Sequence, residues 1–157
     1  MQNGFEMRTA FIKTLCILLI TVNVSLSAQD KVDYISESNG CISLMVTSYG
    51  KKLNIAIENA ETAAIKQILF IGIPDSRILK SPLITTSKED IIDDRYDYFE
   101  KLFKDKRYKS FIKSSSVVSK FTKDITRKKC ITIETCINIE AIRQDLENHQ
   151  IIRKFGL

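Results

Sequence analysis

Two stretches of the chain alternate hydrophobic and polar residues, which is typical of a strand with one buried face. The first covers residues 41–49, where Ile42, Leu44 and Val46 share one side. The second covers residues 130–140 and is the most regular in the sequence. Four of its positions on one side are isoleucine: Ile131, Ile133, Ile137 and Ile139. We therefore expect two strands that each turn one face to a core.

Small and apolar residues at helical spacing predict three helices. The first covers residues 53–71, where alanine and isoleucine recur every three or four positions and Gly72 follows as a C-cap. Ser87, with an acidic residue three positions later, has the pattern of an N-cap for a second helix over 88–113. A break in the second half of that helix is left open. The third helix is expected over 140–153.

The remaining segments connect these elements. Residues 29–39 are polar and end in a turn signal, so a flexible N-terminal segment is expected. Residues 73–88 contain two prolines and several apolar residues, which favours a loop that packs over the core. Residues 117–125 form a weaker strand, which would pair with the last strand as a hairpin through a basic turn at 126–129.

The order of the elements predicts the fold class. Strand, helix, helix, strand, strand and helix follow one another without regular alternation, which indicates an α+β fold. We expect a three-stranded, mainly antiparallel sheet covered by helices on one face. The 157 residues suffice for one domain and are too few for two ordinary ones, so a single α+β domain is predicted over residues 40–157.

The first 28 residues have the layout of a secretory signal peptide. Arg8 and Lys13 supply a positive region, and an apolar run of twelve residues follows before the small residues that end at Ala28. As a helix this run would measure about 18 Å, well short of the roughly 30 Å of a membrane core. We expect cleavage after Ala28 or Ser27, with Met7 as an alternative start. The mature protein would be periplasmic or secreted, without a stable membrane span.

The chain carries an excess of basic residues. Its formal net charge is +5, and +4 remains once the signal peptide is removed. Such a surface either is simply solvated or binds an anionic polymer or ligand. Export and the helical spacing of Tyr96, Phe99 and Phe103, which is typical of a core stripe, argue against nucleic acid. The candidate anion-binding residues are Lys101, Lys104, Arg107, Lys109, Arg127, Lys128 and Lys129.

Three cysteines remain after the signal peptide, and an oxidising compartment would permit one disulfide among them. Cys130 and Cys136 lie on the same predicted strand, about 20 Å apart when extended, so they cannot bond to each other. Cys41 could pair with Cys130 or with Cys136 if the first and last strands are neighbours. Zinc is not expected, because the chain has no CxxC motif and a single histidine.

No catalytic constellation stands out. Glycine-rich phosphate loops and a nucleophile elbow are absent. A cysteine with His149 would be the simplest nucleophile and base, although a solvated histidine explains His149 more simply. The carboxylates between Asp93 and Glu100 suit the start of a helix better than a calcium site, because the glycine-punctuated spacing of a calcium loop is missing. We expect a protein that is not an enzyme and needs no metal or cofactor.

Several runs resemble a group of uncharacterised secreted proteins of Gram-negative bacteria, namely residues 40–50, 68–74 (ILFIGIP), 98–103 (YFEKLF), 107–112 (RYKSFI) and 141–152. More distantly, the chain resembles the small α+β domain of some outer-membrane lipoproteins and of the N-terminal part of a flagellar-assembly protein. The resemblance implies a periplasmic or surface accessory role and assigns no catalytic residue. The chain lacks a lipobox cysteine after its apolar run.

These observations predict a non-enzymatic periplasmic or secreted accessory domain. Its partner would be another envelope protein or a second copy of itself. The alternative is a binding module for an anionic polymer or ligand, which would use the basic segments 101–113 and 127–129.

Overall fold

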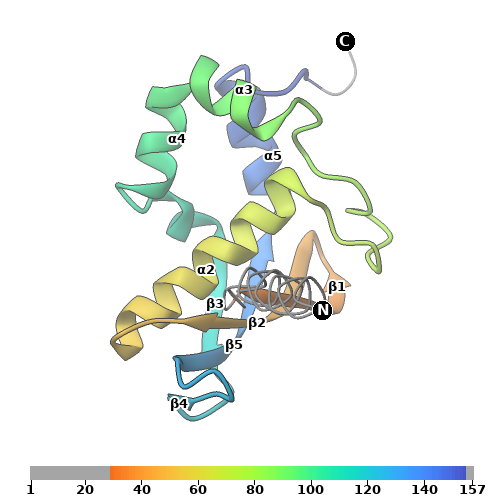
Figure 1. The fold of residues 1–157 in the computed structure, drawn as a ribbon. Coiled ribbons are helices and arrows are strands. Elements are labelled where there is room, and N and C mark those ends of the chain that lie inside the picture. Colours follow the sequence, from red (N-terminus) through yellow and green to blue (C-terminus); the bar gives the residue numbers. More distant parts are fainter. Residues whose placement is uncertain (1–28, 155–157) are drawn as a thin grey trace, which may run out of the picture.

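Figure 1 shows the computed structural model of the chain, which describes residues 29–154. The predicted signal peptide, residues 1–28, lies outside the described residues. Within the described part, five antiparallel strands form one sheet in the order β1-β2-β5-β3, with β4 pairing to β5. The predicted α+β class with an antiparallel sheet is confirmed. The sheet has five strands rather than the three predicted, and the order of the elements differs.

The sheet begins with a hairpin, whose first strand lies in the segment predicted to be flexible. Strands β1 (Lys31–Ser38) and β2 (Cys41–Tyr49) are joined by Asn39 and Gly40, whose φ angles are 49° and 70°. Two successive positive φ angles define the tight turn that matches the twist of a hairpin, and Asn-Gly is its preferred sequence. The expectation of a flexible segment over 29–39 is therefore wrong, whereas the predicted strand over 41–49 is confirmed.

A bulge in β1 interrupts its pattern of apolar and polar residues. Val32 and Tyr34 lie opposite core residues of β2, but the register shifts between Tyr34 and Ser36. After the shift Glu37 takes the inward position opposite Ile42, while Ile35 is exposed. The bulge thus interrupts the alternation of apolar and polar residues that identifies a strand in a sequence.

The core lies between the central strands and one long helix. Strand β5 (Lys129–Asn138) pairs with β2, so that Ile137 lies opposite Ile42. Helix α2 (Leu53–Phe70) crosses this face of the sheet (Figure 1). Alanines let its backbone approach the strands closely, and three of them are fully buried: Ala56, Ala60 and Ala64.

Helix α2 ends at Phe70 with Ile71 as its C-cap, so the predicted cap, Gly72, lies one residue further on. Gly72 has φ +84°, and its N–H donates to the carbonyl of Gln67 at 2.8 Å. A Cβ at this position would lie 2.7 Å from the carbonyl oxygen of Lys80, so only glycine fits. The loop that follows packs over the core as expected, through three buried residues: Ile73, Leu79 and Ile84.

This loop is tied to strand β1 by one carboxylate. Glu37 accepts hydrogen bonds from the hydroxyl of Ser76 (2.5 Å) and from the backbone N–H of Arg77 (3.2 Å). The Arg77 side chain adds an ion pair at 3.1 Å, and the Glu37 side chain is only 7% exposed. We call these contacts the Glu37 latch. The Ser76 hydrogen bond, with those from Arg77, lowers the pKa of Glu37 against the opposing effect of burial.

The predicted helix over 88–113 is broken into α3 (Lys88–Asp94), α4 (Tyr96–Phe103) and the 3₁₀ helix η1 (Arg107–Phe111). The breaks fall at Arg95 and at Lys106, which adopts a φ of 58°.

Packing accounts for the break before η1. In a continuous helix Tyr108 would point about 180° away from Phe99, whereas in the structure both are buried. The predicted N-cap is confirmed, because Ser87 accepts a hydrogen bond from the backbone N–H of Asp90. The expected core stripe holds for Phe99 and partly for Phe103, but Tyr96 is 59% exposed.

The far edge of the sheet also differs from the prediction. The expected strand over 117–125 is replaced by β3 (Ile112–Val117) and the short β4 (Thr122–Lys123), which pair with successive parts of β5. Positions 113–117 of β3 are all exposed, so no burial pattern marked this strand. The last helix, α5 (Ile139–Asn148), is capped by Asn138 and ends before the predicted residue 153, at a turn where Gln150 has φ 57°.

A disulfide joins the two central strands. Of the two pairings left open, the structure contains Cys41–Cys136, with Cα atoms 6.2 Å apart. Cys136 lies opposite Ser43, two residues from Cys41, so the bridge runs diagonally between β2 and β5. Cys130 is a free thiol near the other end of β5.

Candidate functional site

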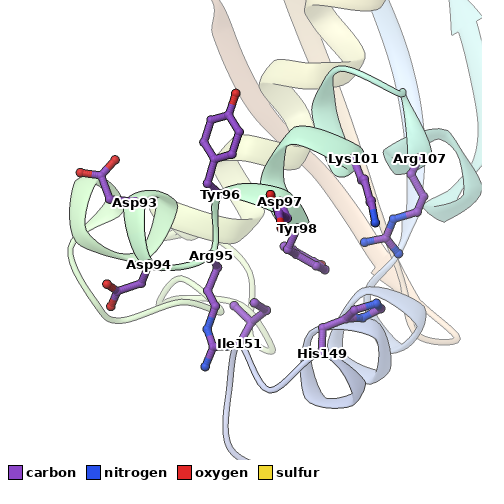
Figure 2. Close-up of a pocket in the computed structure, with 10 residues that line it drawn as sticks. All are labelled: Asp93, Asp94, Arg95, Tyr96, Asp97, Tyr98, Lys101, Arg107, His149 and Ile151. Carbon is purple, nitrogen blue, oxygen red and sulfur yellow. The ribbon is translucent and has the colours of Figure 1, made fainter.

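A hollow of about 570 Å³ opens between helices α3 and α4 and the end of α5 (Figure 2). We call it the α4–α5 hollow. Acidic residues of the predicted cluster, among them Asp93 and Asp97, line it together with Lys101, Arg107 and His149. Carboxylates and cations thus share one surface, which makes the hollow the first candidate site.

Asp145 on α5 organises the polar groups beside this hollow. Its carboxylate accepts hydrogen bonds from the hydroxyl of Tyr98 at 2.7 Å and from the guanidinium of Arg107 at 2.6 Å. The guanidinium also lies over the Tyr98 ring, 5.0 Å from its centre. Nδ1 of His149 is 2.8 Å from the backbone oxygen of Asp145 and thus donates to it. One carboxylate of α5 is therefore bonded to Tyr98 of α4 and Arg107 of η1, which lie 47 and 38 positions earlier in the sequence.

The electrostatics of this cluster favour a structural role. Burial, with the hydrogen bond to Asp145, raises the pKa of Tyr98 well above its ordinary value, so its proton stays in place. Burial lowers the pKa of Arg107, but the hydrogen bond and charge of Asp145, together with Tyr98, outweigh burial, so the pKa of Arg107 is raised. Both Asp145 oxygens are already occupied by donors. A carboxylate bonded to two donors of its own fold ties those elements together, which is a structural role.

The structure does not bring a cysteine to His149. The residues that line the α4–α5 hollow include His149 but no cysteine. Cys41 and Cys136 are bonded to each other, and the Cys130 thiol contacts the carbonyl of Thr122 in strand β4. Within residues 29–154, the sulfur and the imidazole that a nucleophilic pair needs are held in different regions.

The candidate anion-binding residues do not form one surface. Arg127 and Lys128 lie in the turn between β4 and β5, and Lys129 begins β5, at the end of the sheet far from α4 (Figure 1).

Most of the other candidates are paired with carboxylates. Lys104 bonds Glu100 at 2.7 Å, Arg107 bonds Asp145, and Lys109 lies 3.7 Å from Glu58. Lys101 makes no ion pair in the part of the chain that the structure describes and, in Figure 2, turns toward Arg107 and His149.

The outer edge of strand β3 is the second candidate. β3 is the last strand of the sheet and pairs only with β5 in the described chain. The N–H of Val118 donates to the carbonyl of Thr132 at 2.9 Å. Alternation along an antiparallel ladder then directs the N–H and C=O groups of Ser115 and Val117 outward. No local pattern marks this edge in the sequence, because its serines do not alternate with apolar residues.

Comparison with protein-family models, curated proteins and solved structures finds no match for this chain. Among residues 29–154, no helix combines the length and apolar character needed to cross a membrane. The same residues contain no group of three side chains placed to hold a metal ion.

Proposed function

We propose that this chain is a non-enzymatic accessory domain of the periplasm or cell surface. It binds another envelope protein, or a second copy of itself, by adding a strand to β3. The proposal rests on the export signal expected from the sequence and on one structural observation. That observation is the exposed edge of β3, whose residues 113–117 are all exposed.

Strand addition uses backbone groups that the fold leaves unpaired. An incoming strand gains hydrogen bonds along the edge, while neighbouring side chains provide specificity. Free edges of this kind are commonly blocked by charges, proline or a covering loop, because they otherwise associate. β3 has one charged residue, Lys113, no proline, and a central run of three serines. It therefore offers a partner strand little resistance.

The arrangement of β3 also permits self-association. If two copies paired antiparallel about Ser115, Lys113 of each would lie opposite Val117 of the other. Like charges would not face each other, so this register carries no electrostatic penalty. A partner protein with a free strand of its own would use the same backbone groups.

The alternative, binding of an anionic polymer through the basic segments, has weaker support. Its first segment runs from α4 to the start of β3 and its second lies at the β4–β5 turn (Figure 1), and the lysines of the first are mostly neutralised by carboxylates. A polymer that neutralises several cations at once needs them on one continuous track.

The test compares two substitutions at the centre of β3. Ser115→Pro removes an outward N–H without removing a bond to β5, and edge strands tolerate such a proline. Ser115→Thr keeps that N–H and is the matched control. Each variant is exported into its native envelope, and its fold is checked by circular dichroism. The variant then serves as bait. Mass spectrometry identifies the captured partner, and sedimentation detects a dimer.

We expect the unchanged protein and Ser115→Thr to recover the same partner or dimer, and Ser115→Pro to lose it. Equal recovery by Ser115→Pro would exclude strand addition at this edge. Recovery of only sugar or nucleic acid would favour the alternative. Mass spectrometry of the exported protein also shows whether cleavage follows Ala28 or Ser27.

A further inference from the structure

A groove with an aromatic floor lies on the other side of α4 from the α4–α5 hollow. It has a volume of about 350 Å³ and runs between the second half of α2 and helices α3 and α4. We call it the aromatic groove. Tyr96 and Ile92 contribute to its walls, and Phe70, Phe99 and Phe103 line its floor.

The three phenylalanine rings form a continuous row. The ring centres of Phe70 and Phe99 are 5.8 Å apart, and those of Phe99 and Phe103 are 6.4 Å apart. Phe99 is buried, whereas Phe70 and Phe103 are partly exposed and belong to the rim of the core. Because the partly exposed rings are gathered in one row, they form a continuous apolar surface that a partner can cover.

Lysines stand at both ends of the row. The ammonium of Lys88 lies 5.9 Å from the centre of the Phe70 ring, and that of Lys66 lies 5.3 Å from the centre of the Phe103 ring. Neither lysine forms an ion pair with a carboxylate of the described chain. Among residues 29–154, the only carboxylate that lines the groove is Glu100, which is already bonded to Lys104 at 2.7 Å. The groove therefore combines an apolar floor with positive charge at both ends.

We propose that the aromatic groove binds a short segment of a partner protein that has apolar side chains between acidic residues. The apolar side chains would cover the phenylalanine row, and the carboxylates would reach Lys66 and Lys88. An acyl chain fits less well, because it carries one anionic end and needs deeper enclosure, whereas this groove is open and positive at both ends. Charge complementarity thus selects an acidic and apolar peptide. This site is separate from strand β3.

The test uses synthetic peptides labelled with fluorescein. One carries two aspartates at each end and leucine, phenylalanine and leucine between them. A second has asparagine in place of aspartate, and a third has serine in place of the apolar residues. Binding is measured by fluorescence anisotropy with the full chain and with two double variants. Lys66→Glu/Lys88→Glu reverses the groove charges, and Lys51→Glu/Lys52→Glu makes the same change at exposed lysines before α2.

We expect the acidic apolar peptide to bind, and its affinity to fall at least tenfold with Lys66→Glu/Lys88→Glu but not with the control. Both altered peptides should bind at least tenfold more weakly. Failure to bind, equal losses in the two double variants, or displacement of the peptide by dodecanoate at equal concentration would overturn the proposal. Ser115→Pro should leave this binding unchanged, so the groove and the strand edge are tested separately.

Discussion

The two edges of the sheet are built differently. β1 carries charged residues at Lys31, Asp33 and Glu37, and the Glu37 latch fixes the loop after α2 against it. β3 carries Lys113 and a run of serines, and all its residues after the first are exposed. Each edge strand has one bulge, so the two edges differ in their charged residues and in whether a loop is bonded to them.

The comparison shows where this fold tolerates exposed backbone. Charges and a covering loop are the usual means of preventing edge strands from associating, and β1 has charges together with a loop bonded to its Glu37 side chain. β3 has only its bulge and a single lysine. A chain that protects one edge and leaves the other open has a surface available for pairing, and the predictions below test whether β3 is that surface.

Removing the disulfide should have the largest effect and should not distinguish the edges. Cys41→Ser/Cys136→Ser is expected to lower the free energy of unfolding by about 2–5 kcal/mol, because the bridge closes a long loop. It joins the central strands β2 and β5, so β1 and β3 should loosen together. Urea unfolding measures the first effect and amide hydrogen exchange the second. Cys130→Ser, which changes the free thiol, is the control and should leave both edges unchanged.

Breaking the Glu37 latch should loosen β1 alone. Glu37→Gln removes the charge that accepts hydrogen bonds from Ser76 and Arg77. We expect faster amide exchange in β1 and in the loop after α2, with β3 unchanged. Asp33→Asn, which removes an exposed charge from the same strand, is the control. Faster exchange in β3 would mean that the two edges are coupled, and the comparison would fail.

Acid should produce the same separation without a mutation. The hydrogen bond from Ser76 leads the effects that place the pKa of Glu37 below its ordinary value of 4.5 in the folded protein. A carboxyl with a lowered folded pKa stabilises the fold above its unfolded pKa, and this contribution is lost as pH falls through the folded value. As the pH is lowered from 4.5, the protection factors of β1 amides should therefore decrease before those of β3 amides. In Glu37→Gln this difference between the edges should disappear.

The parts of the fold that the sequence predicts are those with one buried face. β2 and α2 are predicted almost to the residue, because burial against a sheet imposes a period on their side chains. β1 was missed although Asn39-Gly40 is a strong hairpin signal, because the bulge hides its alternation. β3 is not predicted, because all its side chains after the first are exposed and none of them has to be apolar, so no alternation appears in the sequence.

The candidate sites could not be predicted, because tertiary contacts create them. Asp145 meets Tyr98 across 47 positions of sequence, and the break at Lys106 that brings Arg107 to the same carboxylate has no local breaker residue. The phenylalanine row joins α2 to α4, while the helical spacing of Tyr96, Phe99 and Phe103 suggested only a core. Pairings between distant segments leave no mark in local composition.

A lysine on β3 should have the smallest effect on folding and the clearest effect on pairing. Ser116 lies opposite Glu134, so Ser116→Lys creates an ion pair across the strands and should change the free energy of unfolding by about 0.2–1 kcal/mol in the stabilising direction. The added charge should also prevent a partner strand from docking. Urea unfolding and sedimentation with the captured partner measure the two effects. Ser36→Lys on β1 should leave pairing intact. If Ser116→Lys destabilised the fold, the serines of β3 would be needed for folding and not for pairing. If pairing survived the added charge, the partner would not bind at the open edge.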